Sequence, residues 1–120
     1  MGILEACFLG ELDAVYACVR IGEPLNKRDA EHNRTALQWA ILQGNLDVAK
    51  YLLDLNVADP ARYDLLMYHT DRYGKTAKNY AIDKKVANND ASFLTVLNDW
   101  KRQCRNPEFE ATSLPISNCG

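Results

Sequence analysis

The sequence predicts an all-α fold made of stacked helix-turn-helix pairs. The central stretch, residues 32–55, contains two short amphipathic segments on either side of Gly44. Thr35 and Gln38 have the spacing of a capping box, which begins a helix, and a glycine such as Gly44 is typical of a helix end. Each predicted helix has only about ten residues, too few for stability alone in water. We therefore expect the pair to bury its apolar side against similar neighbouring pairs.

Copies of this stretch occur on both sides of it. An upstream set lies 34 residues earlier, where Ala6, Gly10, Leu12 and Asp13 align with Ala40, Gly44, Leu46 and Asp47. A downstream set lies 41 residues later, where Thr76-Ala77 and Tyr80-Ala81-Ile82 align with Thr35-Ala36 and Trp39-Ala40-Ile41. Repetition at this spacing indicates a solenoid in which each helix pair contacts only its neighbours.

The shared residues resemble the ankyrin-repeat pattern, roughly D-x-x-G-x-T-P-L-H-x-A-A-x-x-G-H-x-x-V-V-x-L-L-L. The departures are Ala36 and Ala77 at the proline position, Gln38 and Asn79 at the histidine position, and Lys78 at a core leucine. The resemblance implies an ankyrin-repeat solenoid with hairpin-like loops over residues 1–103. Its repeats would span about 1–24, 25–56 and 57–103, the first without its leading hairpin, followed by an irregular tail at 104–120.

The third repeat is preceded by about eight residues more than the pattern needs, within an insertion at 57–70. Its stretch from Leu65 to Tyr68 is too apolar for a free loop. One interpretation is that the insertion folds over the thin core of a short solenoid. The other is that Tyr63, Met67 and Tyr68, with Tyr73 beyond them, form an exposed aromatic contact surface. We weight the two equally. The link at 86–90 after the third inner helix is expected to be longer than the usual glycine turn.

Composition and charge fit a single globular domain. The chain has 120 residues, 48% of them apolar, and a net charge of −2. Residues 1–71 carry 6 basic and 11 acidic side chains, whereas residues 72–105 carry 8 basic and 3 acidic ones. This asymmetry indicates either an unevenly charged solvated surface, which we favour slightly, or a basic binding patch in the third repeat.

No metal site, cofactor site or catalytic centre is expected. Cys7 and Cys18 fall at core positions of the repeat, the chain has no C-x-x-C motif, and His32 and His69 are isolated. Gly74-Lys75-Thr76 resembles the end of a phosphate-binding loop, but the required upstream glycine is missing. Without a signal peptide or a membrane-length apolar run, the sequence predicts a non-enzymatic intracellular protein, cytoplasmic or nuclear.

The function that this pattern favours is binding of a protein partner by an adaptor, because stacked repeats present a rigid surface. The alternatives are a structural subunit of a larger assembly, and weak binding of nucleic acid or anionic lipid by the basic third repeat. The resemblance implies contact through hairpin tips and inner helices. The expected contact residues are Lys27, Arg28, Glu31, His32, Arg34, Arg72 and Tyr73 in the hairpins, Leu42, Gln43, Asp83 and Lys84 on the inner helices, and Tyr63, Met67 and Tyr68 in the insertion.

Overall fold

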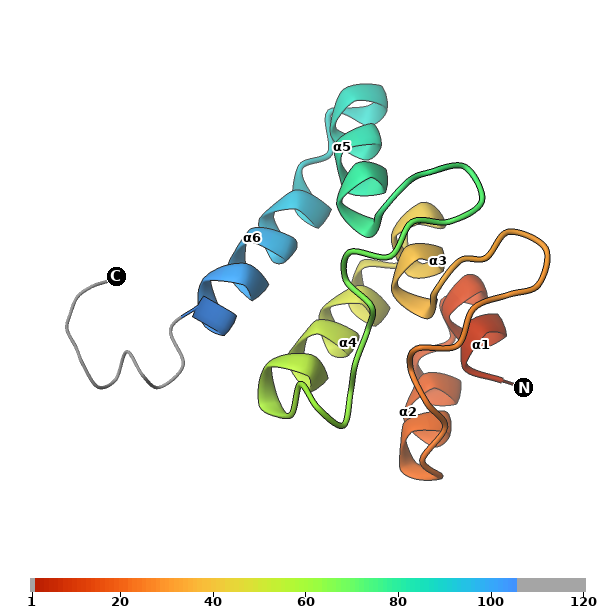
Figure 1. The fold of residues 1–120 in the computed structure, drawn as a ribbon. Coiled ribbons are helices and arrows are strands. Elements are labelled where there is room, and N and C mark those ends of the chain that lie inside the picture. The colour runs from red at the N-terminus through yellow and green to blue at the C-terminus, as the bar shows by residue number, and fades with distance from the viewer. Residues whose placement is uncertain (1, 106–120) are drawn as a thin grey trace, which may run out of the picture.

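The computed structural model describes residues 2–105. In this part the chain forms six helices, arranged as three stacked pairs (Figure 1). The pairs are α1 (Ile3–Leu9) with α2 (Leu12–Arg20), α3 (Ala36–Leu42) with α4 (Leu46–Ala58), and α5 (Ala77–Asn88) with α6 (Ser92–Arg105). The inner helices α1, α3 and α5 pack side by side, and so do the outer helices α4 and α6. The expected all-α stack of helix pairs is therefore confirmed.

Capping boxes begin the inner helices α3 and α5. The first, at Thr35 and Gln38, was predicted from the sequence, and the second, at Thr76 and Asn79, was not. Thr35 Oγ1 accepts a hydrogen bond from the Gln38 N–H (3.2 Å), and Gln38 Oε1 accepts one from the Thr35 N–H (2.8 Å). Thr76 and Asn79 form the same reciprocal pair, at 3.2 and 2.9 Å. Each box satisfies two N–H groups that would otherwise lack a partner at the helix start.

Residues in the left-handed conformation end all three inner helices. Gly10 and Gly44 follow α1 and α3 at φ of 76° and 80°, and Asn89 takes the same conformation after α5 at φ of 55°. The prediction that the link at 86–90 is longer than the usual glycine turn is wrong, because α5 continues as a helix through Asn88. Asparagine tolerates positive φ better than most residues, so Asn89 replaces the glycine and α5 reaches 12 residues, against 7 in α3.

One continuous apolar core runs through the stack, and the predicted inward residues form it. Leu37, Ala40 and Ile41 of α3 are at most 1% exposed, and Leu52 and Leu53 of α4 are buried beside them. The core continues into the flanking pairs through Ile3, Ala6, Cys7, Val15, Cys18, Ala77, Tyr80, Ala81, Phe93 and Leu97. The stack thus supplies the burial that none of these short helices obtains alone.

The last helix extends slightly beyond the predicted end of the repeat domain. We placed the boundary at residue 103, and α6 continues to Arg105. Residues 106–120, which make up the rest of the predicted tail, lie outside the described part of the chain.

Candidate partner-binding surface

Two loops extend in the same direction beyond the inner helices, one before α3 and the other before α5 (Figure 1). We call residues 26–34 the first hairpin, residues 70–75 the second hairpin, and the two together the hairpin face. An isolated antiparallel bridge between Arg28 and Thr35 closes the base of the first hairpin. These loops contain seven of the fourteen predicted contact residues.

Asp29 organises the first hairpin. Its carboxylate accepts hydrogen bonds from the N–H groups of His32 (2.7 Å) and Arg34 (2.8 Å) and from the Trp39 indole (3.1 Å). Burial by itself would raise the pKa of Asp29, but these hydrogen bonds outweigh burial and lower that pKa. The loop is thereby held on α3. Asn33 takes a left-handed φ of 56° where the repeat pattern has glycine.

Asp71 has the same role in the second hairpin and is more deeply buried. Its Oδ1 accepts from the N–H groups of Tyr73 (2.9 Å) and Lys75 (3.0 Å), and its Oδ2 accepts from the Tyr80 hydroxyl. Burial again opposes the charged form, and the hydrogen bonds, with Arg34 as a further donor, lower the pKa of Asp71. Trp39 and Tyr80 stand at equivalent positions, so α3 and α5 each supply an aromatic donor to the aspartate of the hairpin before them.

Arg34 connects the two hairpins. Its Nε lies 3.2 Å from Asp71 Oδ2, and its guanidinium carbon lies 4.6 Å from the Trp39 ring centroid and 5.2 Å from that of Tyr73. Only 11% of the Arg34 side chain is exposed, while that of Asp71 is fully buried. The expected role of Arg34 as a contact residue at a hairpin tip stays a prediction. In the structure its guanidinium is used within the chain.

Further hydrogen bonds tie the second hairpin, and His69 just before it, to the second repeat. The Arg72 N–H donates to His32 O (2.9 Å), and His69 Nε2 lies 2.9 Å from Asn33 O. The buried Gln38 amide donates to His69 O (2.9 Å) and Lys75 O (3.0 Å). Sequence reasoning placed Gln38 in the capping box of α3 and noted it as a departure from the repeat pattern, but it missed the contacts of Gln38 with the second hairpin and the organising role of Asp29 and Asp71. The hairpin face is consequently a braced surface.

Aromatic side chains line the inner-helix side next to the first hairpin. Phe8 of α1 is 40% exposed and packs edge-to-face on Trp39, with ring centroids 5.0 Å apart. His32 contacts both Trp39 (5.5 Å) and Tyr73, whose hydroxyl is 3.0 Å from His32 Nδ1. Tyr73 itself is 56% exposed. A row of rings therefore crosses from α1 to the second hairpin, beside a wide shallow hollow lined by Leu4, Glu5, Phe8, Asp29, Glu31, His32 and Trp39.

Phe8 was absent from the predicted contact residues, although the repeat alignment contained the signal for it. The 34-residue offset that aligns Ala6 with Ala40 also aligns Phe8 with Leu42, and Leu42 was predicted to be at the surface. The same offset aligns Leu9, which is 50% exposed, with Gln43. The exposed apolar side of the first repeat is thus an extension of the predicted inner-helix surface.

The predicted inner-helix residues differ in how accessible they are. Gln43 and Asp83 are exposed, and Leu42 and Lys84 are partly buried. Asp83 pairs with Lys75 at 2.5 Å, and the Lys84 ammonium lies 3.9 Å from the place of a β-carbon on Gly44. The Asp83 and Lys84 side chains therefore make contacts within the solenoid in addition to being accessible from solvent.

Four predicted hairpin residues, Lys27, Arg28, Glu31 and Arg72, are exposed. The Lys27 side chain lies apart from the other three. Its ammonium pairs with Glu23 at 2.8 Å, and Glu23 also accepts a hydrogen bond from the Ile3 N–H. Lys27 consequently lies near the start of α1. The other three remain accessible on the hairpin face.

The insertion combines the two interpretations of it. Leu65 is 1% exposed, and Tyr63 and Met67 pack partly buried against the core, whereas Tyr68 is 77% exposed. Asn56 of α4 holds the segment by donating to Tyr63 O at 2.9 Å. The insertion therefore covers the core. Its exposed Tyr68 does not lie beside Tyr73, because Tyr73 belongs to the hairpin face and Tyr68 lines a hollow beside α6.

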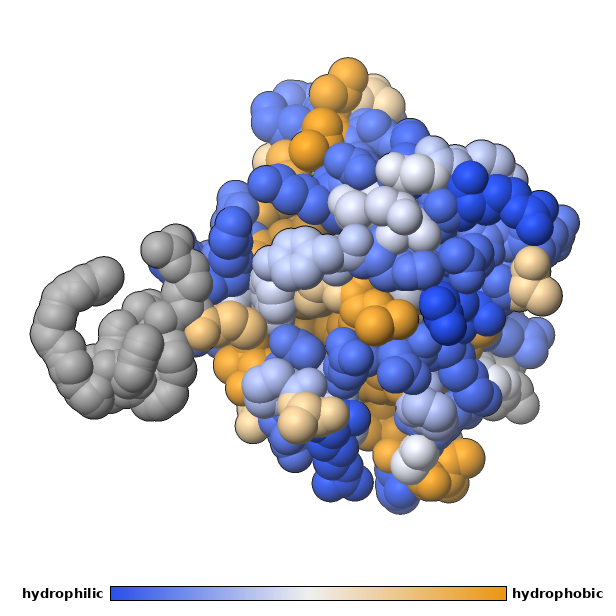
Figure 2. All heavy atoms as spheres, viewed as in Figure 1, coloured by the Kyte–Doolittle hydropathy of each residue, from blue (hydrophilic) through white to orange (hydrophobic). Residues whose placement is uncertain are grey.

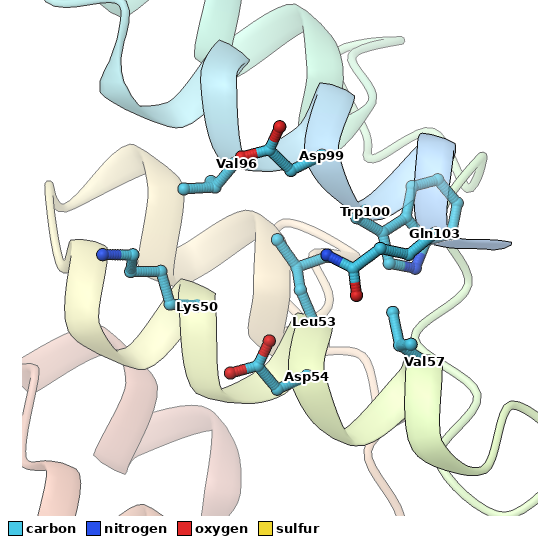
Figure 3. Close-up of a pocket in the computed structure, with 8 residues that line it drawn as sticks. All are labelled: Lys50, Leu53, Asp54, Val57, Val96, Asp99, Trp100 and Gln103. Carbon is cyan, nitrogen blue, oxygen red and sulfur yellow. The ribbon is translucent and has the colours of Figure 1, made fainter.

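A groove that sequence reasoning missed lies between the outer helices α4 and α6 (Figure 3). Its volume is about 120 Å³. The side chains that line it are Lys50, Leu53, Asp54 and Val57 from α4 and Val96, Asp99, Trp100 and Gln103 from α6. Its charged residues have both signs, so it favours neither a cationic nor an anionic ligand.

Apolar side chains interrupt the hydrophilic surface in a few places. Figure 2 shows apolar atoms in two such places: beside the segment that precedes α5, and at the far end of α5. On α5, the Val86 side chain is 79% exposed. Among residues 2–105, no set of three His, Cys, Asp or Glu side chains is placed to hold a metal ion. None of the helices in this range is both long and apolar enough to cross a membrane.

Three stacked helix pairs with braced hairpins on one side define a helical-repeat protein of the kind that presents a binding surface. The family model described as "Ankyrin repeats (3 copies)" matches residues 3–98. The chain therefore belongs to the ankyrin-repeat family, whose repeats are generally protein-interaction modules and typically lack enzymatic activity.

Two curated relatives from Arabidopsis thaliana match a shorter part of the chain. Acyl-CoA-binding domain-containing protein 1 is 47% identical over 47 residues, and acyl-CoA-binding domain-containing protein 2 is 45% identical over 47 residues. Each match covers 39% of this chain and 14% or 13% of the relative. The matched segment thus spans about a seventh of the length of these relatives.

Proposed function

We propose that this chain is a non-enzymatic adaptor that binds a protein partner across the hairpin face and the adjoining exposed side of α1, α3 and α5. The row of rings formed by Phe8, Trp39, His32 and Tyr73 carries this proposal. Trp, Tyr and Arg dominate the residues that contribute most to protein–protein affinity, and here they lie together around Arg34.

Rigidity of the surface is the second argument. Asp29 and Asp71 each bind the backbone of their own loop, and Arg34 and Gln38 bind the second hairpin to the preceding repeat. A partner that binds to a braced surface does not have to order it, so less of the interaction energy is lost to conformational entropy.

The test is a double substitution that removes the exposed rings, Phe8→Ala with Tyr73→Ala. Partners purified with the wild-type chain and identified by mass spectrometry should bind the double variant at least about tenfold more weakly, the loss expected when two central aromatic contacts are removed. Ile21→Ala is the matched control, since Ile21 is 79% exposed at the end of α2 and lies outside the hairpin face. Unchanged binding by a folded double variant would contradict the proposal.

The basic third repeat gives weaker support to an anionic-ligand function. Two of its cations already have partners, Lys75 with Asp83 and Arg102 with Asp99. Fewer accessible charges remain than the sequence count indicates, and affinity for a polyanion depends on that number. We therefore retain protein binding as the proposed function.

A further inference from the structure

A second surface feature lies away from the hairpin face. It is a hollow of about 130 Å³ enclosed by the insertion, the start of α5 and the middle of α6. We call it the insertion hollow. Because the insertion at 57–70 contains about eight residues more than the repeat pattern needs, one wall of this hollow, formed by Met67 and Tyr68, comes from a segment that the pattern does not account for.

The floor of the insertion hollow is apolar. Met67, Leu97 and Trp100 form it, and all three are packed on the core. The one polar atom of the Trp100 side chain is already used, because its Nε1 donates to Asn56 Oδ1 at 2.7 Å. The indole therefore presents an apolar surface that favours an apolar side chain as its ligand.

The rim of the hollow is cationic and aromatic. Lys78 and Lys101 are exposed there, and within residues 2–105 neither ammonium group has a carboxylate within ion-pair distance. Tyr68, 77% exposed, completes the rim. Within the described residues 2–105, no carboxylate lines this hollow, in contrast to the groove between α4 and α6, which has Asp54 and Asp99. The two lysines are therefore complementary to an acidic ligand.

We propose that the insertion hollow binds an acidic segment of a protein partner, with one apolar side chain on the floor and flanking carboxylates at Lys78 and Lys101. A hollow of about 130 Å³ accommodates a single side chain, and an acyl chain needs a longer cavity. This argues for a peptide and against a lipid. The site is independent of the hairpin face, since the two surfaces have no lining residue in common.

The experiment uses the full chain and a fluorescently labelled synthetic peptide with one phenylalanine between two pairs of glutamates. Fluorescence anisotropy measures the affinity. We expect saturable binding that weakens at least about tenfold in Lys78→Glu with Lys101→Glu, and also when the peptide phenylalanine becomes alanine. Tyr68→Ala should weaken peptide binding severalfold. Because the Tyr68 side chain is exposed, we expect this variant to fold normally.

The matched control is Lys84→Glu with Lys85→Glu, which changes the net charge by the same amount at two positions outside the hollow, both on α5, the helix that carries Lys78. It should bind the peptide within about twofold of wild type, as should the Phe8→Ala, Tyr73→Ala variant, which separates this site from the proposed function.

Three results would overturn the inference. They are an equal loss in the control, equal binding of anionic phospholipid vesicles with the same dependence on Lys78 and Lys101, and no peptide binding by the wild-type chain. Tighter peptide binding by a Glu108→Gln, Phe109→Ala variant would assign the hollow to this chain's own C-terminal segment and would likewise exclude a partner as its occupant.

Discussion

At the scale of single residues, two aspartates shape the hairpin face. Asp29 and Asp71 each accept two N–H groups from their own loop and a side-chain donor from the following helix. A short loop cannot satisfy these backbone groups by itself, and the carboxylate does so from its centre. The same chemistry at equivalent positions explains why loops of different length have the same orientation.

These carboxylates predict loss of stability in acid. Because folding lowers the pKa of Asp29 and Asp71 below the ordinary 3.8, each stabilises the fold above about pH 4, and the stabilisation disappears as the pH falls through the lowered value. Urea unfolding from pH 7 to pH 2.5 should show this fall. The Asp71→Asn variant should have a lower free energy of unfolding than wild type at pH 7, and its free energy of unfolding should decrease less steeply as the pH falls. An identical slope in the variant would contradict the assignment.

Arg34→Ala should destabilise the protein although the residue belongs to a hairpin loop. The change leaves the buried Asp71 carboxylate without its cation and removes a contact with the Trp39 ring, so we expect a loss of about 2 kcal/mol in the free energy of unfolding. It should also move the acid transition to higher pH. Arg28→Ala is the control, since the Arg28 side chain is exposed and should change stability by less than about 0.5 kcal/mol. Equal values for both would show that Arg34 is not structural.

At the scale of elements, the repeats are joined by contacts between the end of one helix and the beginning of another. The Asn45 side chain, just before α4, donates to Cys7 O (2.8 Å) and Phe8 O (3.2 Å) at the end of α1. Those carbonyls belong to the last turn of α1, where no helical N–H is available to them. The Asn45 side chain thus caps the C-terminus of α1, a helix of the preceding repeat.

Gly10→Ala should cost more stability than Gly22→Ala. Both glycines have positive φ, 76° and 87°, so both variants suffer the left-handed penalty of about 1 kcal/mol. Only at Gly10 would the new β-carbon meet a neighbour, Asn45 Oδ1 at 2.6 Å, and moving Asn45 would break its two hydrogen bonds. We expect an additional loss of about 1–2 kcal/mol by chemical denaturation. Equal losses would mean that Asn45 adjusts without cost.

The insertion depends on one buried amide. Asn56→Ala removes the acceptor of Trp100 Nε1 and the donor to Tyr63 O, which should lower the free energy of unfolding by about 2 kcal/mol. Hydrogen exchange should accelerate most in residues 59–68, because this segment loses its anchor on α4. Asn26→Ala is the control at an exposed position. Uniform acceleration over the whole chain would argue against a local role.

At the scale of the whole molecule, the protein is a short solenoid in which the central pair contacts both others. A single core connects the three pairs, so they are expected to unfold together. Figure 1 shows the central pair enclosed by its neighbours, whereas the first and last pairs each have one open side. Stability should therefore be most sensitive to the central repeat.

Ile41→Ala tests that expectation. Ile41 is fully buried in α3, and the cavity should lower the free energy of unfolding by about 2–4 kcal/mol while one transition is retained. Trp39 in the second repeat and Trp100 in the third report on different parts of the stack by fluorescence. Their transitions should coincide with each other and with circular dichroism. Ile21→Ala, at an exposed position, should change little, and separated transitions would show independent repeats.

Much of this structure was predictable because its signals are local. The capping box at Thr35, the turn glycines and the apolar stripes of α3 and α4 depend on residues within about four positions of one another. The end of α5 was predicted wrongly, because Asn89 was not recognised as the residue that takes the glycine's place. Phe8 was missed although the alignment of repeats placed it beside Leu42.

By itself, the sequence determined the number and order of the helix pairs, their capping and their buried sides, since each follows from short-range spacing and hydrophobicity. Only the tertiary structure decided which polar groups meet. The pairing of Arg34 with Asp71, the contact of Asn45 with α1, and the placing of Trp100 under Tyr68 in the insertion hollow join residues more than thirty positions apart. Such meetings depend on how repeats stack and on where the insertion folds, and no local pattern encodes them.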